Sequence, residues 1–273
     1  MSKRNSQASK TAARERLRQE RERQAKRDKV KRQVIVACSA LAVLAAAGGI
    51  GYAVVQGNKP EYWENVKSEK LVKPANTSGE NGTTVIIGKA GAKKTLAMYE
   101  DPRCPICAQF EQTVGPTVNK DVEDGKYKIQ YVGATFLDGK LGGEGSRNAL
   151  SALGAALNVS PEAFLEYKTA MYSAKYHPDE TEDKFKSDAY LIEVANTVSA
   201  LKNNTKFQTA VKNGTYDKWA LVMSDKFDTD SKKYGIQGTP SLVMDGKLVN
   251  GSNGSAPMTV AEYNTAIAAA LKG

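Results

Sequence analysis

The sequence contains few of the side chains that usually bind metals or carry acid–base chemistry. Its 273 residues include three cysteines and a single histidine, His177. A structural zinc site needs about four ligands, and a serine-type catalytic triad needs a histidine beside its nucleophile. This scarcity excludes histidine-rich metal centres and such triads, and we expect no bound metal and no cofactor. His177 stands before a proline, so we expect it in a surface loop.

Most of the chain also lacks an excess of charge of either sign. Residues 1–33 carry the whole net charge of +9, whereas the remaining 240 residues hold 26 basic and 26 acidic side chains. A nucleic-acid-binding domain normally has its basic surface on its folded part. The neutral balance beyond residue 33 therefore argues against nucleic acid as a partner of the folded domain.

One long uncharged run stands out from this mixed background. Residues 34–55 read VIVACSALAVLAAAGGIGYAVV, and a helix of this length spans roughly 33 Å, close to the hydrocarbon thickness of a bilayer. One alternative is a buried core helix, although such long uncharged runs are rare in soluble proteins. A cleaved signal peptide, with an apolar part of about 7–15 residues, is the other. The run predicts an uncleaved anchor, in which Cys38 is a small apolar residue.

The charges that flank this run predict its orientation in a membrane. Basic residues crowd its N-terminal side, and the positive-inside rule keeps such a flank in the cytoplasm. We therefore predict a basic cytoplasmic tail at residues 1–33, a single-pass anchor in the cell membrane, and a domain on the outer side. The tail can also contact anionic lipid, and binding to RNA or to a protein is its alternative role.

The part beyond the anchor divides into a linker and one domain. Residues 56–82 are polar and rich in Asn, Gly, Lys and Glu, which predicts a flexible linker. Residues 83–273 show the periodicities of an α/β domain, in the order two strands, helix, strand, helical block at about 144–224, two strands and helix. The strands are expected at Thr84–Gly88, Thr95–Glu100, Tyr127–Thr135, Ser241–Met244 and Lys247–Asn250.

Capping residues and prolines indicate where the helices begin and end. Pro105 falls in the first turn of the first helix of this domain, and Pro116 should end or kink that helix. Ser160 is a good N-cap within the helical block. Thr259 and Glu262 form a capping box at the start of the last helix, and Asp-Gly between the last two strands predicts a tight hairpin.

Two cysteines, Cys104 and Cys107, form a Cys-x-x-Cys pair in the stretch YEDPRCPICAQF. A zinc site would need further ligands, and a structural disulfide that closes so short a loop would stabilise the fold little. A redox dithiol fits better, because the dipole and free N–H groups of a helix N-terminus favour a thiolate there. Cys104 is then the attacking thiol, and Cys107, one turn further in and more buried, is the resolving thiol.

Two motifs, YEDPRCPIC after a strand and GTPSLVM before the last hairpin, resemble the DsbA-like branch of the thioredoxin superfamily, as does the helical block between them. The resemblance covers about residues 83–273 and implies a thioredoxin-like fold with an inserted helical subdomain. It also implies that Pro240 follows a cis peptide bond and faces the dithiol. Thr239 and Pro240, together with Pro105 and Ile106, are then predicted to bind substrate, because an extended peptide can pair with the exposed backbone of Thr239.

The sequence departs from the strongest oxidants of this family between the two cysteines. The dipeptide is Pro-Ile instead of Pro-His, and Ile106 cannot hydrogen-bond a thiolate. Arg103 should favour the thiolate of the first cysteine by its charge, while Glu100 and Asp101 should oppose it. A carboxylate beneath the site could also relay the proton of the second cysteine, and we take Asp101 as that candidate. The alternative is that both carboxylates are solvated loop residues.

Together these observations predict an extracytoplasmic thiol–disulfide oxidoreductase that forms disulfides in exported proteins and is recycled by a membrane thiol oxidase. A reductase or isomerase with the same dithiol is one alternative. A non-catalytic module that binds peptides or senses redox state is another. The predicted fold class is α/β, a thioredoxin-like domain with inserted helices that follows a single N-terminal transmembrane helix.

Overall fold

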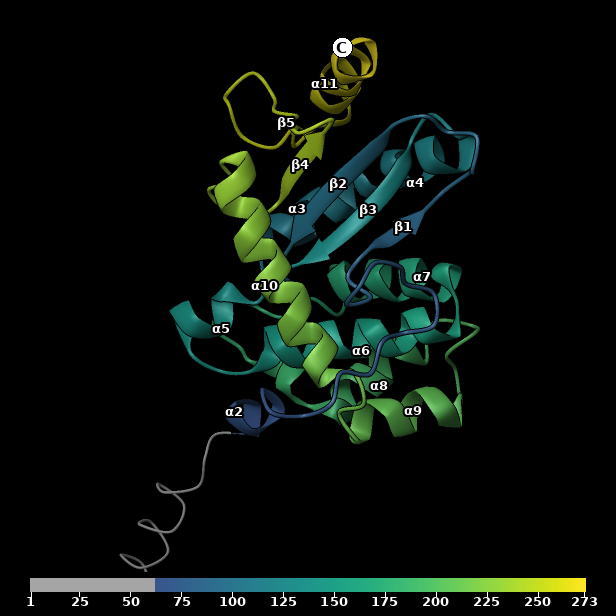
Figure 1. Cartoon of the computed structure of the whole chain (residues 1–273), viewed down its shortest axis with the longest axis vertical. Coiled ribbons are helices and arrows are strands. Elements are labelled where there is room, and N and C mark those ends of the chain that lie inside the picture. Colours follow the sequence, from purple (N-terminus) through teal and green to yellow (C-terminus); the bar gives the residue numbers. More distant parts are fainter. Residues whose placement is uncertain (1–61) are drawn as a thin grey trace, which may run out of the picture. The chain divides into compact units, whose positions relative to one another are not determined.

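The computed structural model of the chain describes residues 62–273. The predicted tail, the predicted anchor at 34–55 and the first residues of the predicted linker lie outside this range. Within residues 62–273 no helix combines the length and the apolar character needed to cross a membrane. The described part consists of a five-stranded sheet with helices packed on it and a helical subdomain at one end of the strands (Figure 1).

The sheet has the strand order β1-β3-β2-β4-β5. In its centre, β2 (Thr95–Glu100) and β3 (Lys128–Gly133) run parallel, which requires a crossover connection between them. β1 (Val85–Ile87) pairs antiparallel with β3, so the first two strands of the sequence are not partners. β4 (Ser241–Met244) pairs antiparallel with β2, and β5 (Lys247–Leu248) forms the other edge. The C-terminal end of β2 thus lies beside the beginning of β4.

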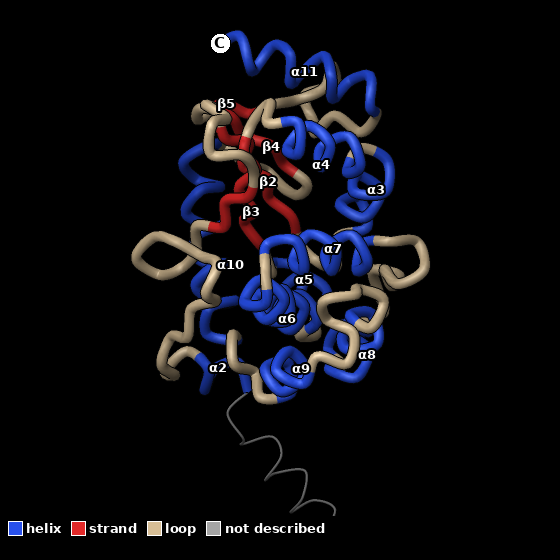
Figure 2. The backbone as a smooth tube through the Cα atoms, turned by 90° about the vertical axis from the view of Figure 1, so that its right-hand side faces the viewer, coloured by secondary structure: helices blue, strands red, loops and turns tan. Residues whose placement is uncertain are grey.

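The crossover between β2 and β3 consists of α3 (Pro105–Thr113) and α4 (Gly115–Asp124). The two helices are separated at Val114, just before Pro116, whose ring interrupts the hydrogen-bond ladder as predicted. They lie on one side of the strands, and α10 (Asp217–Tyr234) lies on the other side (Figure 2). The dithiol stretch is therefore held between a central strand and a helix that packs on the sheet.

The helical subdomain is inserted between β3 and α10. Its centre is α6 (Gly145–Val159), which is buried on almost every side and packs against α7 (Pro161–Tyr172), α9 (Thr205–Lys212) and α10. Gly154 on α6 has no room for a side chain, because a Cβ there would lie 2.8 Å from the ring of Trp219. The helices of the subdomain are α5 (Phe136–Leu141), α6 (Gly145–Val159), α7 (Pro161–Tyr172), the 3-10 helix η1 (Lys184–Lys186), α8 (Asp188–Ala195) and α9 (Thr205–Lys212).

Several local predictions are confirmed at the residue level. Ser160 caps α7 by accepting a hydrogen bond from the Ala163 N–H, and Thr259 caps α11 (Val260–Lys272) in the same way. The tight hairpin between β4 and β5 places Asp245 and Gly246 at φ +50° and +79°, a conformation that favours glycine at the second position. The capping and turn residues therefore indicated the boundaries of these elements correctly.

The described part of the predicted flexible linker is packed on the domain and is not free. The short helix α2 (Tyr62–Val66) buries Trp63, and the Tyr62 hydroxyl donates to Asp217 at 2.6 Å. Further along, the Trp219 indole donates to the Gly82 carbonyl oxygen at 2.7 Å. Polar contacts of this kind hold much of residues 62–82 on the domain. The prediction of a flexible linker from the polar composition is therefore wrong for these residues.

Candidate active site

Cys104 follows the C-terminal end of β2 and is the N-cap residue of α3. Its backbone N–H donates to the Asp101 carbonyl oxygen at 2.9 Å, which closes a turn between strand and helix. Pro105 occupies the first helical turn, where its missing N–H costs nothing. The Cys104 side chain therefore lies at the helix N-terminus, and the Cys107 N–H donates to its sulfur at 3.3 Å.

The surroundings of the Cys104 sulfur favour the thiolate. Hydrogen bonding from the Cys107 thiol has the largest effect, burial opposes it, and hydrogen bonds from Thr239 and from the N–H groups of Ile106 and Cys107 add to it. Their balance lowers the pKa of Cys104 from 9.0 to about 6. Near neutral pH the reduced pair therefore carries its negative charge on Cys104, the form that attacks disulfides and leaves from them.

Cys107 occupies the opposite environment one helical turn further on. Its side chain is fully buried, whereas Cys104 keeps 6% of its surface exposed. Burial raises the pKa of Cys107 well above its ordinary value, and the Cys104 sulfur and the charge of Glu100 raise it further. Cys107 therefore remains a protonated thiol. The apolar residues that pack around the two sulfurs are Ala108, Leu137 and Tyr172.

The second motif meets the dithiol as the resemblance implies. The Thr239–Pro240 peptide bond is cis, and Pro240 is buried immediately before β4. The Cys104 sulfur lies 3.4 Å from the Thr239 carbonyl oxygen, although 135 residues separate the two in sequence. The Thr239 hydroxyl is also buried and has no other hydrogen-bond partner among residues 62–273, and by donating toward the sulfurs it lowers the pKa of both thiols.

A groove of about 370 Å³ runs beside this loop. Ile106, which is 49% exposed, forms one wall of the groove with Thr239 and Pro240, and no charged side chain lines it. Pro105, the other predicted substrate-binding residue, begins α3 but is not among the residues that line the groove. The other residues that line the groove are Gly235, Gln237, Gly238, Ser241, Leu248, Asn250, Gly254, Ser255, Ala256 and Met258.

Arg103 does not have the role that its position in the sequence predicted. Its side chain is 2% exposed, and it does not contribute to the lowered pKa of Cys104. It donates to the Asp138 carboxylate at 3.0 Å and to the Gly142 and Glu180 carbonyl oxygens at 2.8 and 3.3 Å. Because its charge is satisfied by these partners, Arg103 joins the loop before Cys104 to the helical subdomain and does not act on the thiolate.

Asp101 is fully buried and not a solvated loop residue. Its carboxylate accepts hydrogen bonds from the N–H groups of Arg103 and Leu137, at 3.0 and 3.1 Å, and from the Ser146 hydroxyl at 2.6 Å. Burial raises the pKa of Asp101 to about 7, although these hydrogen bonds oppose the shift. Its contacts are those of an anchor for the loop, and its role as the proton relay remains a prediction.

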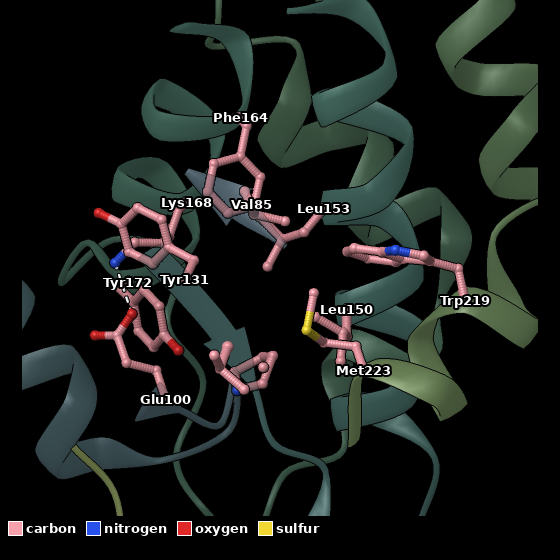
Figure 3. A pocket seen from close by; sticks show the side chains of 13 residues that line it. Val85, Glu100, Tyr131, Leu150, Leu153, Phe164, Lys168, Tyr172, Trp219 and Met223 are labelled. Carbon is pink, nitrogen blue, oxygen red and sulfur yellow. Dashed lines mark hydrogen bonds and ion pairs between the residues drawn. The ribbon is translucent and has the colours of Figure 1, made fainter. Parts of the chain in front are cut away.

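Glu100 is the carboxylate that acts on Cys107, and it belongs to a buried charge cluster with Lys168 and Glu111. The Lys168 ammonium lies 2.7 Å from each of the two carboxylates, and all three side chains are at least 93% buried. Figure 3 shows Glu100 and Lys168 beside the rings of Tyr131 and Tyr172, over which the ammonium lies at 4.7 and 5.1 Å. Burial raises the pKa of Glu100, Lys168 opposes the shift, and Glu111 adds to it.

A small cavity of about 30 Å³ adjoins this cluster. Glu100 and Lys168 lie at one end, and Leu150, Met223 and Trp219 form an apolar end (Figure 3). The Glu100 Oε1 atom has no hydrogen-bond donor among residues 62–273. A cavity of this size can hold a water molecule that would hydrogen-bond such an atom.

Lys168 and Glu111 were not predicted from the sequence, although their spacing carried a signal. Lys168 comes four residues after Phe164 and three before Met171, which places it on the buried face of α7. Glu111 likewise comes four residues after Cys107 on α3. A charge on the apolar face of each of two helices is the pattern that could have indicated a buried ion pair.

His177 is a further functional candidate that the sequence did not indicate. It does not lie in a free surface loop, because its Nε2 atom is 3.1 Å from the Pro102 carbonyl oxygen. Its ring is stacked on Tyr172 at 5.7 Å and meets Phe185 edge-on at 6.0 Å. No sequence pattern marks a single histidine as the partner of a loop 75 residues away.

Comparisons with known proteins agree with this geometry. A family model described as Thioredoxin matches residues 80–269. The chain is 26% identical over 166 residues to disulfide bond formation protein D of Bacillus subtilis (strain 168). This match covers 60% of this chain and 68% of that protein. It is 23% identical over 167 residues to the serine/threonine-protein kinase PknE of Mycobacterium tuberculosis, but this match covers only 29% of the kinase.

Solved structures show the same similarity. The reduced form of the disulfide bond oxidoreductase DsbG from Mycobacterium tuberculosis matches with a TM-score of 0.52 and 25% identity, over 68% of this chain and 95% of that one. Reduced DsbA from the same organism gives a TM-score of 0.51 and 25% identity, over 67% and 99%. Oxidised BdbD from Bacillus subtilis gives a TM-score of 0.56 and 22% identity, over 74% of this chain and 100% of that one. This similarity shows a shared fold.

Proposed function

The chain belongs to the thioredoxin family, and from this premise we propose that it forms disulfide bonds in exported proteins, outside the cytoplasm, through Cys104 and Cys107. Its relatives include disulfide bond oxidoreductases, and the chain is a protein thiol–disulfide oxidoreductase. The direction of the reaction, its location and its partners are the parts that we propose.

The observation that carries the proposal is the inequality of the two thiols. The pKa of Cys104 is lowered to about 6 while that of Cys107 is raised. A low pKa stabilises the reduced form of the dithiol, and a disulfide whose reduced form is stabilised is a stronger oxidant. It also makes the Cys104 thiolate a good leaving group when a substrate disulfide closes. Both effects favour transfer of a disulfide to the substrate.

The proposed reaction starts from the Cys104–Cys107 disulfide. A substrate thiolate attacks the Cys104 sulfur, so a mixed disulfide forms and Cys107 leaves as a thiolate that takes up a proton. The second thiolate of the substrate then attacks the first substrate sulfur, which is bonded to Cys104 in the mixed disulfide. The substrate disulfide forms and Cys104 is released as a thiolate. The substrate loses two electrons and the dithiol gains them. A membrane thiol oxidase is the proposed acceptor that removes these electrons and restores the disulfide.

The groove beside the cis-proline loop supports this substrate class. It holds no charged side chain, and it borders Cys104 through Ile106 and Thr239. An extended, uncharged peptide segment can lie there and pair with the backbone of Thr239 while its cysteine reaches the exposed edge of Cys104. Such segments are accessible in exported proteins that have not finished folding.

Proton transfer at Cys107 is assigned to Glu100 in this proposal, in place of the predicted Asp101. Cys107 gains a proton when its thiolate leaves and must lose it again when the disulfide is restored. Glu100 influences the pKa of Cys107 directly and has an oxygen without a hydrogen-bond donor among the described residues. Asp101, in contrast, uses its carboxylate to hold the loop and the beginning of α5.

The proposed location rests on the sequence outside the described residues. A basic segment at 1–33 followed by the apolar run at 34–55 favours a single-pass anchor with a cytoplasmic N-terminus. Such an anchor would place the dithiol outside the cell membrane, near exported proteins and near a membrane oxidase. A membrane-impermeant thiol reagent applied to intact cells should therefore label Cys104 in the reduced protein. Labelling only after lysis would contradict this location.

The experiment that tests the function combines trapping with a redox titration. The Cys107→Ala variant should accumulate mixed disulfides with exported proteins through Cys104, and a Cys104→Ala variant should accumulate none. Equilibration of the wild-type protein with glutathione should give a reduction potential nearer about −120 mV than about −270 mV. A potential near the lower value would favour the reductase reading. If Cys104→Ser supports the same cellular task, the protein is a binding or sensing module instead.

A further inference from the structure

His177 is held against the active site by three contacts on three different segments. Its Nε2 atom lies 3.1 Å from the carbonyl oxygen of Pro102, two residues before Cys104. Its ring is stacked on Tyr172 at the end of α7, with an angle of 14° between the planes. Its other contact is Phe185, a fully buried residue of η1. The imidazole therefore bridges the loop before the dithiol and the helical subdomain.

The contact with Pro102 requires a particular form of the imidazole. A carbonyl oxygen only accepts hydrogen bonds, so Nε2 must carry a proton and donate it. Burial lowers the pKa of His177, although its hydrogen bonds to carbonyl oxygens oppose the shift. A neutral imidazole donates from only one nitrogen, and protonation at Nε2 is the form that makes the 3.1 Å bond to Pro102.

The contact with Tyr172 extends the influence of His177 to the sulfurs. Tyr172 is 3% exposed and packs with Cys104 and Cys107 in one apolar cluster. His177 thus touches both the segment that leads into Cys104 and the ring that covers the dithiol. Asp101 anchors the same loop through contacts with α5 and α6, whereas His177 fixes it at Pro102.

From these contacts we propose that His177 is a positioning residue for the dithiol: its Nε2–H bond to Pro102 and its stacking on Tyr172 hold the Cys104 sulfur at the N-terminus of α3. The proposal deepens the function proposed above and rests on it. It also offers a reason why a chain with isoleucine between its cysteines can keep a reactive thiolate. The imidazole acts through its contacts with Pro102 and Tyr172 and needs no contact with the sulfur.

A pair of substitutions separates the two contacts of His177. His177→Phe keeps an aromatic ring to stack on Tyr172 but removes the donor to Pro102, whereas His177→Gln supplies an amide N–H at nearly the position of Nε2. The pKa of Cys104 is measured in the full-length chain from the thiolate absorbance near 240 nm, with Cys104→Ser as the blank. His177→Phe should raise this pKa by about 0.5–1 unit, and His177→Gln should restore most of the shift.

Two results would overturn the proposal. The first is a His177→Phe variant whose Cys104 titrates as in the wild type, and the second is a His177→Gln variant as impaired as His177→Phe. Equal melting temperatures for the two variants show that the comparison concerns the loop and not global stability. If His177→Phe does not fold, ¹⁵N chemical shifts of the single histidine in the unmodified chain still decide. They should show protonation at Nε2 near neutral pH, and protonation at Nδ1 alone contradicts the proposal.

The outcome is independent of the test of the proposed function. If the wild-type protein exchanges no disulfide with exported proteins, the proposed function fails, while the titrations still decide whether His177 positions Cys104. If exchange occurs and the titrations of wild type and His177→Phe coincide, only the role of His177 is removed.

Discussion

The two sides of the dithiol differ more than their separation in sequence suggests. On the Cys104 side are the free N–H groups of a helix, the cis-proline loop and an uncharged groove that is open to solvent. Cys107, in contrast, is fully buried, and its pKa is raised by Glu100, one of three buried charges beside a small cavity. One turn of helix therefore separates a thiol that is poised to react from one that is kept protonated.

The difference shows that the reactivity of such a pair is set by segments distant from it in sequence. Cys104 lies against Thr239, which a late loop brings to it. The pKa of Cys107 is raised mainly by burial and further by the charge of Glu100, which is paired with Lys168 on α7. The Cys-x-x-Cys motif supplies two sulfurs at bridging distance. The sheet and the inserted helices supply the inequality between them.

The largest expected effect comes from removing the cation of the buried charge cluster near Cys107. Lys168→Met removes the only cation from a cluster that holds two carboxylates, which leaves uncompensated charge in the interior. Loss of one partner from such a buried cluster costs about 3–5 kcal/mol of unfolding free energy. Urea unfolding of the reduced variant measures this loss.

Lys120→Met serves as the matched control for that substitution. Lys120 is also paired with a carboxylate, Asp124, but its side chain is 72% exposed. An exposed pair contributes about 0–1 kcal/mol, so this variant should unfold almost as the wild type does. Similar losses for the two variants would mean that the buried charge cluster does not stabilise the domain as described.

A smaller effect is expected from the pH dependence of stability on the Cys104 side. Because the folded-state pKa of Cys104 is lowered to about 6 from 9.0, the unfolded chain binds more protons between these values. The stability contributed by Cys104 is therefore fully present above about pH 9 and is lost as pH falls through 6, with a slope of about 1.4 kcal/mol per pH unit at most.

The measurement for this prediction is the difference in unfolding free energy between the reduced wild type and Cys104→Ser, followed from pH 5 to 9. Taking the difference removes the opposite contributions of Glu100 and Asp101, whose pKa values are raised on folding. A difference that does not change across this range would show that the Cys104 thiolate is not favoured in the folded protein.

The smallest expected effect separates the two carboxylates of the buried charge cluster. Glu100→Gln removes the carboxylate proposed to exchange a proton with Cys107, so the step in which Cys107 resolves a mixed disulfide with glutathione should slow about a hundredfold at pH 7. Glu111→Gln changes the same cluster at a carboxylate that does not contribute to the raised pKa of Cys107, and it should leave the rate almost unchanged. Stopped-flow kinetics measure both, and equal rates in the two variants would assign the relay elsewhere.

Much of this site could be predicted because its chemistry is carried by local patterns. The strand at Thr95–Glu100, the Cys-x-x-Cys pair at a helix start and the proline of the second motif are all marked by neighbouring residues. The side chains of such a strand alternate between a buried face and the opposite face, and proline marks the first turn of the helix that follows. Few other secondary structures fit this pattern. These features therefore placed Cys104 and Cys107 correctly before any tertiary contact was known.

What the sequence did not reveal depends on partners that only folding brings together. Glu100 and Lys168 are 68 residues apart, and neither local pattern shows that the two charges are buried together. Arg103 stands next to Cys104, yet its charge is used by Asp138 in another segment. His177 has no neighbours that mark it at all. The prediction that Arg103 favours the Cys104 thiolate was wrong, because burial and pairing with other residues decide which group a charge acts on.

The most direct test of the inequality between the two sides is the alkylation of each thiol alone. Cys107→Ala leaves Cys104 and Cys104→Ala leaves Cys107, with Cys38→Ser in both chains so that one thiol remains. Iodoacetamide rates followed from pH 4 to 10 should give Cys104 a midpoint near 6 and leave Cys107 almost unreactive at neutral pH. Equal rates at pH 7, or a Cys104 midpoint near its ordinary value of 9.0, would contradict the account.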